Sequence, residues 1–192
     1  MVGNTPNYNK YDILRCFLRL NKNIGRQELS KELGLGEGTV RTILEMLKSK
    51  KLLDSTKKGH FLSDKGIAEL NKISRDITGP TIINAKAVYP EFRKAAILLR
   101  KFNQFKESYK LRDIAVKNDA EGALILKFEN SLYAPESEYK GNFEEFEKYF
   151  DFENGNILIV AFANNAKDAE TGAIAAAAEL NDALKKFIEN FE

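Results

Sequence analysis

One stretch near the N-terminus, residues 26–49 (RQELSKELGLGEGTVRTILEMLKS), constrains the fold more than any other part of the chain. Its first half places Leu29 and Leu33 one helical turn apart, and Gly34 follows at once, as is usual where a left-handed residue ends a helix. Its second half carries apolar residues at i, i+3, i+4 and i+7, the spacing of a helix with one buried face; these are Val40, Ile43, Leu44 and Leu47. The pattern predicts two helices joined by a tight turn that contains glycine.

The face of the second helix opposite this apolar stripe is short and polar. At about 100° per residue, it holds Gly38, Thr39, Arg41, Thr42 and Glu45. Two helices joined by such a turn, with a small polar outer face on the second, are typical of a helix-turn-helix. The second helix of that motif fits the major groove of B-DNA, where its side chains reach base edges. An ordinary helical hairpin in a small core would also explain the apolar positions, so the flanking sequence matters.

The flanking segments supply further elements. Residues 13–20 predict an amphipathic helix before the motif, and residues 52–62 (LLDSTKKGHFL) predict a β-hairpin with a basic tip after it. Ser63 can then cap a helix that begins at Asp64, with an apolar face formed by Ile67, Leu70 and Ile73.

The order helix, helix, helix, basic hairpin, helix over residues 11–73 resembles the winged helix of prokaryotic and archaeal transcription regulators. The resemblance implies a recognition helix at residues 37–49, which would lie in the major groove, and a wing at residues 52–62, which would lie on the DNA backbone. One position departs from the family, which commonly has glycine just before the first strand of the wing, where this chain has Lys51. A left-handed Lys51 would carry a strain of about 1 kcal/mol; otherwise the corner must differ.

The charge distribution agrees with this interpretation. Residues 1–77 contain 15 Lys and Arg against 9 Asp and Glu, whereas residues 78–192 contain 15 against 19. A basic N-terminal half suits a phosphate-binding module. We therefore predict that double-stranded DNA is read by the outer face of the second helix and held by nearby cations. The predicted DNA-binding residues are Arg26, Gly38, Thr39, Arg41, Thr42, Lys57, Lys58 and His60.

Composition argues against several other classes of protein. No stretch approaches the roughly 18 apolar residues of a membrane span, and the N-terminus lacks a signal-peptide core, so we expect a cytoplasmic protein without membrane contact. A single cysteine, Cys16, and a single histidine, His60, cannot form a Cys/His zinc site or a Cys/His or Ser/His/Asp catalytic set. The sequence therefore predicts no enzyme activity, no metal and no cofactor.

A second domain is predicted after residue 77. Gly79-Pro80 is a strong stop signal, so we expect a winged-helix domain at residues 1–77 and an α+β domain at residues 78–192. The C-terminal half alternates strand-like and helix-like runs in the order strand, helix, strand, strand, helix, strand, helix. Its last helix is predicted to run unbroken over residues 168–191. The first six elements follow the split β-α-β order of ferredoxin-like sheets, so the predicted fold class is α+β, a winged helix followed by a ferredoxin-like α/β sandwich.

The C-terminal half also resembles a known family. The segments RDIAVKNDAEGALILKFENSLYAPE and NILIVAFANNAKDAETGAIAAAAEL are similar to the C-terminal domain of an archaeal family of winged-helix regulators, a domain of unknown function. The resemblance implies an archaeal regulator and a strand at AAILLR, but it supplies no ligand.

A small anionic effector could bind where the strand NILIVAFA turns into the last helix, because a helix N-terminus presents unpaired N–H groups. The candidate ligand-binding residues are Arg112, Asp113, Asn164, Asn165, Thr171 and Gly172. Alternatively, Asn165 or Asp168 simply caps the helix and the domain only dimerises. A homodimer is expected in either case, because one recognition helix reads only a few base pairs. Its candidate interfaces are the first helix, the helix of Ile67, Leu70 and Ile73, and the alanine-rich last helix. The alternative function is an enzyme or RNA-binding protein that carries the winged helix as an accessory or docking module.

Overall fold

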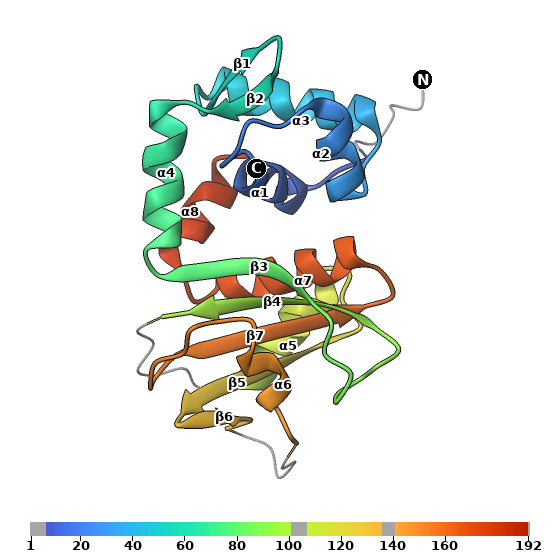
Figure 1. The fold of residues 1–192 in the computed structure, drawn as a ribbon, viewed down its shortest axis with the longest axis vertical. Helices are drawn as coiled ribbons and strands as arrows, with labels where there is room; N and C mark the ends of the chain where they lie inside the picture. The colour runs from blue at the N-terminus through green and yellow to red at the C-terminus, as the bar shows by residue number, and fades with distance from the viewer. Residues whose placement is uncertain (1–6, 101–106, 136–140, 192) are drawn as a thin grey trace. The chain divides into compact units, whose positions relative to one another are not determined.

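A computed structural model describes residues 7–100, 107–135 and 141–191 of the chain (Figure 1). The fold is α+β, as predicted: helices dominate the N-terminal part, and an antiparallel sheet of five strands dominates the C-terminal part. The chain divides into two compact units, residues 1–73 together with 186–192, and residues 74–185. Relative to the predicted domains of residues 1–77 and 78–192, residues 74–77 cluster with the C-terminal unit and residues 186–192 with the N-terminal unit.

Residues 7–74 form four helices and a two-stranded hairpin. In chain order they are α1 (Lys10–Arg19), α2 (Arg26–Leu33), α3 (Glu37–Ser49), β1 (Leu53–Thr56), β2 (Gly59–Leu62) and α4 (Asp64–Ser74). The amphipathic periods in the sequence produce the helices, since α1, α2 and α3 each bury an apolar face. The core of the N-terminal unit includes Ile13, Phe17, Leu29, Leu33, Ile43 and Leu47, each no more than 1% exposed.

Helix α1 carries a buried ion pair that the sequence pattern did not reveal. Its N-cap, Asn9, accepts hydrogen bonds from the backbone N–H groups of Tyr11 and Asp12, and the Asp12 carboxylate accepts one from the N–H of Asn9. The Arg15 guanidinium lies 2.9 Å from Asp12 and also donates to the carbonyl oxygen of Leu33 at 3.0 Å. Both charged side chains are almost fully buried, so they link the start of α1 to the end of α2.

The sheet of the C-terminal unit is antiparallel throughout. Its strands are β3 (Ile77–Ile83), β4 (Arg93–Leu99), β5 (Gly122–Glu129), β6 (Ser131–Tyr133) and β7 (Ile157–Ala163), and they lie in the order β3-β4-β7-β5-β6. The predicted strand at AAILLR is β4, and the predicted hairpin between GALILKF and Leu132-Tyr133 is β5-β6. Strands β4 and β5 are both antiparallel to β7, so they run parallel to each other and form a split β-α-β unit around it through α5 (Ser108–Lys117).

The prediction of a ferredoxin-like sheet was wrong in one respect, namely which strand lies between β4 and β5. The ferredoxin-like pattern puts the third strand of the unit, here β6, between the first two, whereas the structure puts β7 there. Strand β6 has three residues and only Leu132 is buried, which suits an edge. All seven residues of β7 are buried, which suits the centre of a sheet that is covered on both faces.

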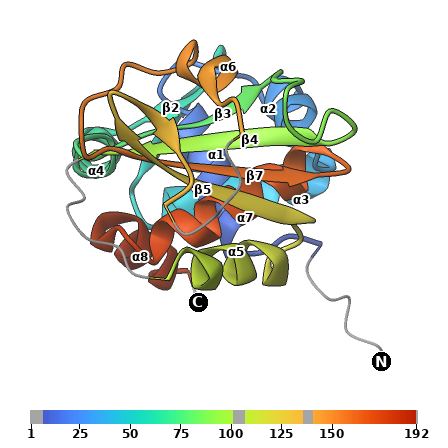
Figure 2. The same ribbon diagram turned by 90° about the horizontal axis from the view of Figure 1, so that it is seen from below.

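Helices cover one face of this sheet, and short segments cover the other (Figure 2). Helix α7 (Ala166–Ala178) packs on β3, β4 and β7, and α5 packs on β5 and α7. The opposite face buries an apolar cluster that includes Leu98, Leu126, Leu158 and Val160, closed by Phe143 and Phe146 at α6 (Glu144–Glu147).

Two further local predictions were wrong. Gly79-Pro80 does not end a domain but lies within β3, at an irregularity in its pairing with β4. The last helix is not continuous, since α7 ends at Ala178 and α8 (Asp182–Glu189) begins after a break. The Asn181 side chain accepts a hydrogen bond from the N–H of Leu184 at 2.9 Å, and this local bond competes with an uninterrupted helix.

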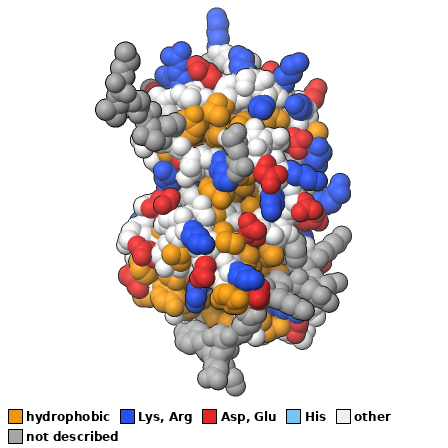
Figure 3. All heavy atoms as spheres, turned by 180° about the vertical axis from the view of Figure 1, so that it is seen from behind, with side chains coloured by type: hydrophobic (Ala, Val, Ile, Leu, Met, Phe, Trp, Pro, Cys, Tyr) orange, Lys and Arg blue, Asp and Glu red, His pale blue; other side chains and the backbone are white. Residues whose placement is uncertain are grey.

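No helix among the described residues is long and apolar enough to cross a membrane. The surface seen in Figure 3 mixes charged and apolar side chains.

Candidate nucleic-acid interface

Helix α3 presents the side chains that the sequence analysis selected. Its apolar stripe is buried, so the opposite face turns outward. Gly38, Arg41 and Thr42 are exposed and Thr39 is partly exposed. The Thr42 hydroxyl donates to the carbonyl oxygen of Gly38 at 3.2 Å. Four predicted DNA-binding residues therefore share one accessible face.

Two carboxylates hold the arginines of this region in defined positions. Arg41 lies 3.0 Å from Glu45, one turn later on α3, and the Arg41 side chain is 69% exposed. Arg26, at the start of α2, lies 3.3 Å from Glu37 at the start of α3. Exposed pairs of this kind are worth no more than about 1 kcal/mol, so a phosphate or a base can replace the carboxylate at small cost.

The hairpin places the other predicted cations. Strands β1 and β2 pair from Leu53↔Leu62 to Thr56↔Gly59, which leaves Lys57 and Lys58 exposed in the turn. The start of β2 is fixed to the segment before α2, because Ile24 and His60 exchange backbone hydrogen bonds of 3.0 and 2.9 Å. A Cβ at Gly59 would lie 2.7 Å from the carbonyl oxygen of Ile24, so glycine permits this close approach.

A hollow of about 250 Å³ lies between α3 and the hairpin. Arg26, Arg41 and His60 line it, together with Lys48, a residue that the sequence analysis did not select. Lys48 follows Arg41 by seven positions, and this helical spacing was the signal that could have identified it. Glu45 and Ser55 supply further polar groups.

The surroundings of His60 lower the pKa of its imidazole. Its Nδ1 lies 2.8 Å from the Ser55 hydroxyl. Burial lowers its pKa below the ordinary histidine value, and the positive charges of Lys48 and Arg26 lower it further. His60 is therefore mainly neutral near pH 7, and a phosphate placed in the hollow would favour its protonation.

The residues predicted to bind an effector lie in different surroundings, and among them only Arg112 lines a groove. Asn165 caps α7 by accepting from the N–H of Asp168 at 2.9 Å, and its amide donates to the Asp168 carboxylate at 2.6 Å. Asn164 donates to Glu121 at 2.7 Å, and Thr171 donates to the carbonyl oxygen of Lys167 at 2.9 Å. The polar side chains of this junction thus bond to neighbouring groups of the protein, and Asn165 is the cap of α7 that the alternative prediction named.

The remaining predicted effector residues have other surroundings. A Cβ at Gly172 would lie 2.6 Å from the Ala120 Cβ, so this glycine allows α7 to pack closely on the segment after α5. Arg112 and Asp113 are exposed on α5, with 3.5 Å between the guanidinium and the carboxylate. Arg112 lines a groove of about 760 Å³ in the C-terminal unit, whereas the other predicted effector residues do not. Within the described ranges, no group of three or more His, Cys, Asp or Glu side chains could hold a metal ion.

Comparisons with known proteins agree with this two-part organisation. Residues 11–68 match the family model described as the N-terminal domain of PH0730-like proteins, and residues 91–180 match a domain of unknown function, DUF4443. The structure is similar to that of the hypothetical protein PH0730 from Pyrococcus horikoshii OT3, with a TM-score of 0.75 and 29% sequence identity over 94% of this chain and 100% of that chain. The chain is similar to an archaeal two-domain protein over nearly its whole length. No curated protein matches it.

Proposed function

We propose that the protein is a sequence-specific, double-stranded DNA-binding transcription regulator, with a winged helix formed by α1 to α4. The observation that carries the proposal is the hollow between α3 and the hairpin, where Arg26, Arg41, Lys48 and His60 surround one space. A set of basic groups beside an accessible helix of short polar residues suits a nucleic acid, because phosphates need cations and base edges need close approach.

The dimensions of α3 support docking in the major groove. Its 13 residues span about 20 Å, and the major groove admits an α-helix. Thr39, Arg41 and Thr42 would face base edges, and the small Gly38 would let the start of the helix approach closely. Lys57 and Lys58 on the hairpin would follow the phosphate backbone beside the groove, while Arg26 would hold a phosphate at the start of α2.

We further propose that the regulator acts as a homodimer, because two recognition helices read two half-sites. Two of the three interfaces expected from sequence are occupied within single units. The apolar residues of α1 are buried against α2, α3 and Phe187, and α7 is covered by the sheet and α5. Ile67 on α4 remains 47% exposed and is the candidate contact. Sedimentation should give a dimer, and a species of 21.7 kDa at micromolar concentration with and without DNA would exclude one.

The DNA-binding proposal is tested by selecting bound sequences from a random duplex library and measuring affinity by fluorescence anisotropy. Arg41→Ala should cost about 1–3 kcal/mol on the selected sequence and relax the preference at one base position. Lys57→Ala should weaken all duplexes alike and reduce the slope of log K against log salt by about one unit. The matched control is Lys72→Ala on α4, whose side chain pairs with Glu69 at 2.9 Å and should leave both quantities unchanged.

The same titration distinguishes a DNA-binding regulator from an RNA-binding protein that carries the winged helix as an accessory. Single-stranded DNA and a duplex RNA of the selected sequence should bind more weakly than the DNA duplex. Preferential binding of RNA, or unchanged affinity for the selected DNA in Arg41→Ala, would contradict the assignment of α3 as the recognition helix.

A further inference from the structure

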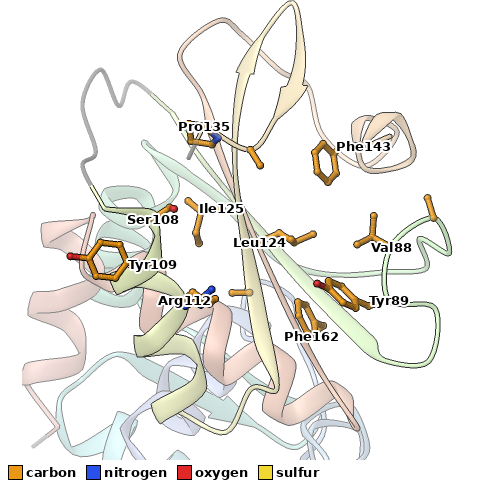
Figure 4. A pocket seen from close by; sticks show the side chains of 13 residues that line it. Val88, Tyr89, Ser108, Tyr109, Arg112, Leu124, Ile125, Pro135, Phe143 and Phe162 are labelled. Atoms are coloured by element: carbon orange, nitrogen blue, oxygen red, sulfur yellow. The ribbon is translucent and has the colours of Figure 1, made fainter. Parts of the chain in front are cut away.

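The C-terminal unit contains a groove of about 760 Å³ along strand β5 (Figure 4). Strand β6 pairs with only the last part of β5, Lys127–Glu129, and the groove lies beside the preceding residues, Ala123 to Ile125. Successive side chains of a strand point to opposite faces, so Leu124 and Ile125 lie on opposite sides of β5. The groove therefore has two sides, one on each side of β5.

One side is aromatic. Tyr89 stacks on Phe162 with 4.4 Å between the ring centroids, and Phe92 packs on Phe162 at 5.5 Å. Phe162 is only 8% exposed, whereas Tyr89 is 43% exposed. Val88 and Phe143 lie on the same side of β5 as Tyr89. This side offers a flat aromatic surface that is backed by a packed ring rather than by a mobile side chain.

The backbone that carries Tyr89 is held in an unusual conformation. Tyr89 has a φ of 49°, in the left-handed region, which costs a residue with a bulky side chain about 1–3 kcal/mol. The buried Lys94 ammonium donates to the carbonyl oxygens of Tyr89 at 2.7 Å and Phe92 at 3.2 Å. The carboxylate of Glu145 accepts from the N–H groups of Lys86 and Ala87 at 2.6 and 2.8 Å. The surrounding structure therefore fixes the position of the Tyr89 ring before any ligand arrives.

The other side of the groove carries a cation. Ser108, Tyr109 and Arg112 on α5 lie across β5 from Val88 and Phe143. The Arg112 side chain is 57% exposed, and its guanidinium lies 3.5 Å from Asp113, a distance too long for a strong hydrogen bond. The Tyr109 hydroxyl donates to Glu107 at 3.2 Å. The guanidinium therefore keeps donors that an incoming anion could use.

We propose that this groove binds a small molecule with a flat aromatic or apolar body and one anionic group, the body lying on Tyr89 and the anion meeting Arg112. Ligand sites of this size are commonly lined by apolar and aromatic side chains, with a few polar groups that fix the orientation. The proposal uses only residues of the C-terminal unit and does not depend on DNA binding.

A matched pair of fluorescent probes tests the proposal. The anionic probe is 1-anilinonaphthalene-8-sulfonate, and the neutral probe is N-phenyl-1-naphthylamine, which lacks the sulfonate. The protein contains no tryptophan, so its own fluorescence interferes little with either titration. We expect saturable binding with one site per chain and tighter binding of the anionic probe.

Three variants separate the two sides of the groove. Arg112→Gln should weaken the anionic probe about tenfold and leave the neutral probe unchanged, because it removes a charge-assisted bond. Tyr89→Ala should weaken both probes. Lys117→Gln, an exposed position on the same helix that does not line the groove, should change neither. Circular dichroism establishes that each variant is folded.

Three outcomes would overturn the proposal. The first is an absence of saturable binding. The second is an Arg112→Gln variant that binds the anionic probe as tightly as the wild type. The third is equal weakening of that probe by Lys117→Gln, which would show attraction to the general charge of α5 rather than to a site.

Discussion

Gly34 and Lys51 hold the same position at the ends of two successive helices. Both have left-handed backbones, with φ of 66° and 60°. In each case the next residue closes the turn, Leu35 donating to the carbonyl oxygen of Ser30 at 3.1 Å and Leu52 to that of Leu47 at 3.0 Å. This is the Schellman arrangement, in which glycine is the usual left-handed residue. The left-handed Lys51 considered from the sequence is thus what the structure contains.

Replacing this lysine should stabilise the protein. A left-handed residue with a side chain costs about 1–2 kcal/mol, and the greater freedom of glycine in the unfolded chain offsets part of the gain. We expect Lys51→Gly to raise the free energy of unfolding by about 0.5–1 kcal/mol in urea titrations followed by circular dichroism. Lys50→Gly is the control, because Lys50 is right-handed with φ of −81° and should lose stability. A loss in both variants would contradict this account of the corner.

The buried pair of Asp12 and Arg15 should be strongly coupled. Arg15→Leu would remove the guanidinium that lies 2.9 Å from the buried Asp12 carboxylate, and we expect a loss of about 3–5 kcal/mol. The double variant Asp12→Asn, Arg15→Leu should be more stable than the single one, since a neutral amide replaces the buried carboxylate. A double-mutant cycle measures this coupling, and strictly additive losses would show that the pair does not act as a unit.

The contact at Gly172 should be sensitive to a single methyl group. Gly172→Ala would bring its Cβ within 2.6 Å of Ala120 and 3.2 Å of the Ala115 carbonyl oxygen. Overpacking of this kind costs about 1–3 kcal/mol. Thermal unfolding should show the loss, and adding Ala120→Gly should recover part of it because it removes the opposing methyl group. Failure of this second change to recover stability would place the strain at the Ala115 backbone.

Binding of DNA should depend on pH through His60. In the free protein its pKa is lowered, first by burial and then by Lys48 and Arg26. A bound phosphate would raise that pKa, so complex formation takes up a proton and affinity should increase as pH falls from 7.5 to 5.5. One unit of pKa change corresponds to about a tenfold change in affinity, which sets the scale of the effect.

The measurement is anisotropy at constant ionic strength across this pH range. His60 is the only histidine of the chain, so His60→Gln should remove most of the dependence. Affinity that is flat in the wild type, or that varies equally in His60→Gln, would show that His60 does not meet phosphate.

The helices and strands that are specified by residues close together in the sequence could be predicted from it. The apolar periods of 29–33 and 40–47 specify α2 and α3, and Gly34 specifies the turn between them. The runs RKAAILL and GALILKFE specify β4 and β5. The exposed face of Gly38, Arg41 and Thr42 follows from the same period, because burying one side of a helix turns the other side outward.

Contacts between distant segments required the tertiary structure. No local sequence pattern predicts that β7 lies between β4 and β5, or that the helix breaks before α8. Lys48 lines the hollow because the hairpin packs beside α3, which the sequence of α3 alone does not show. Asp12 and Arg15, which in sequence look like ordinary surface charges, are buried by residues that follow much later. Helical period and turn chemistry act over a few residues, so the sequence displays them directly. Strand order, burial of charge and the walls of a groove depend on which of many possible long-range pairings has the lowest free energy, and only the folded chain reveals that choice.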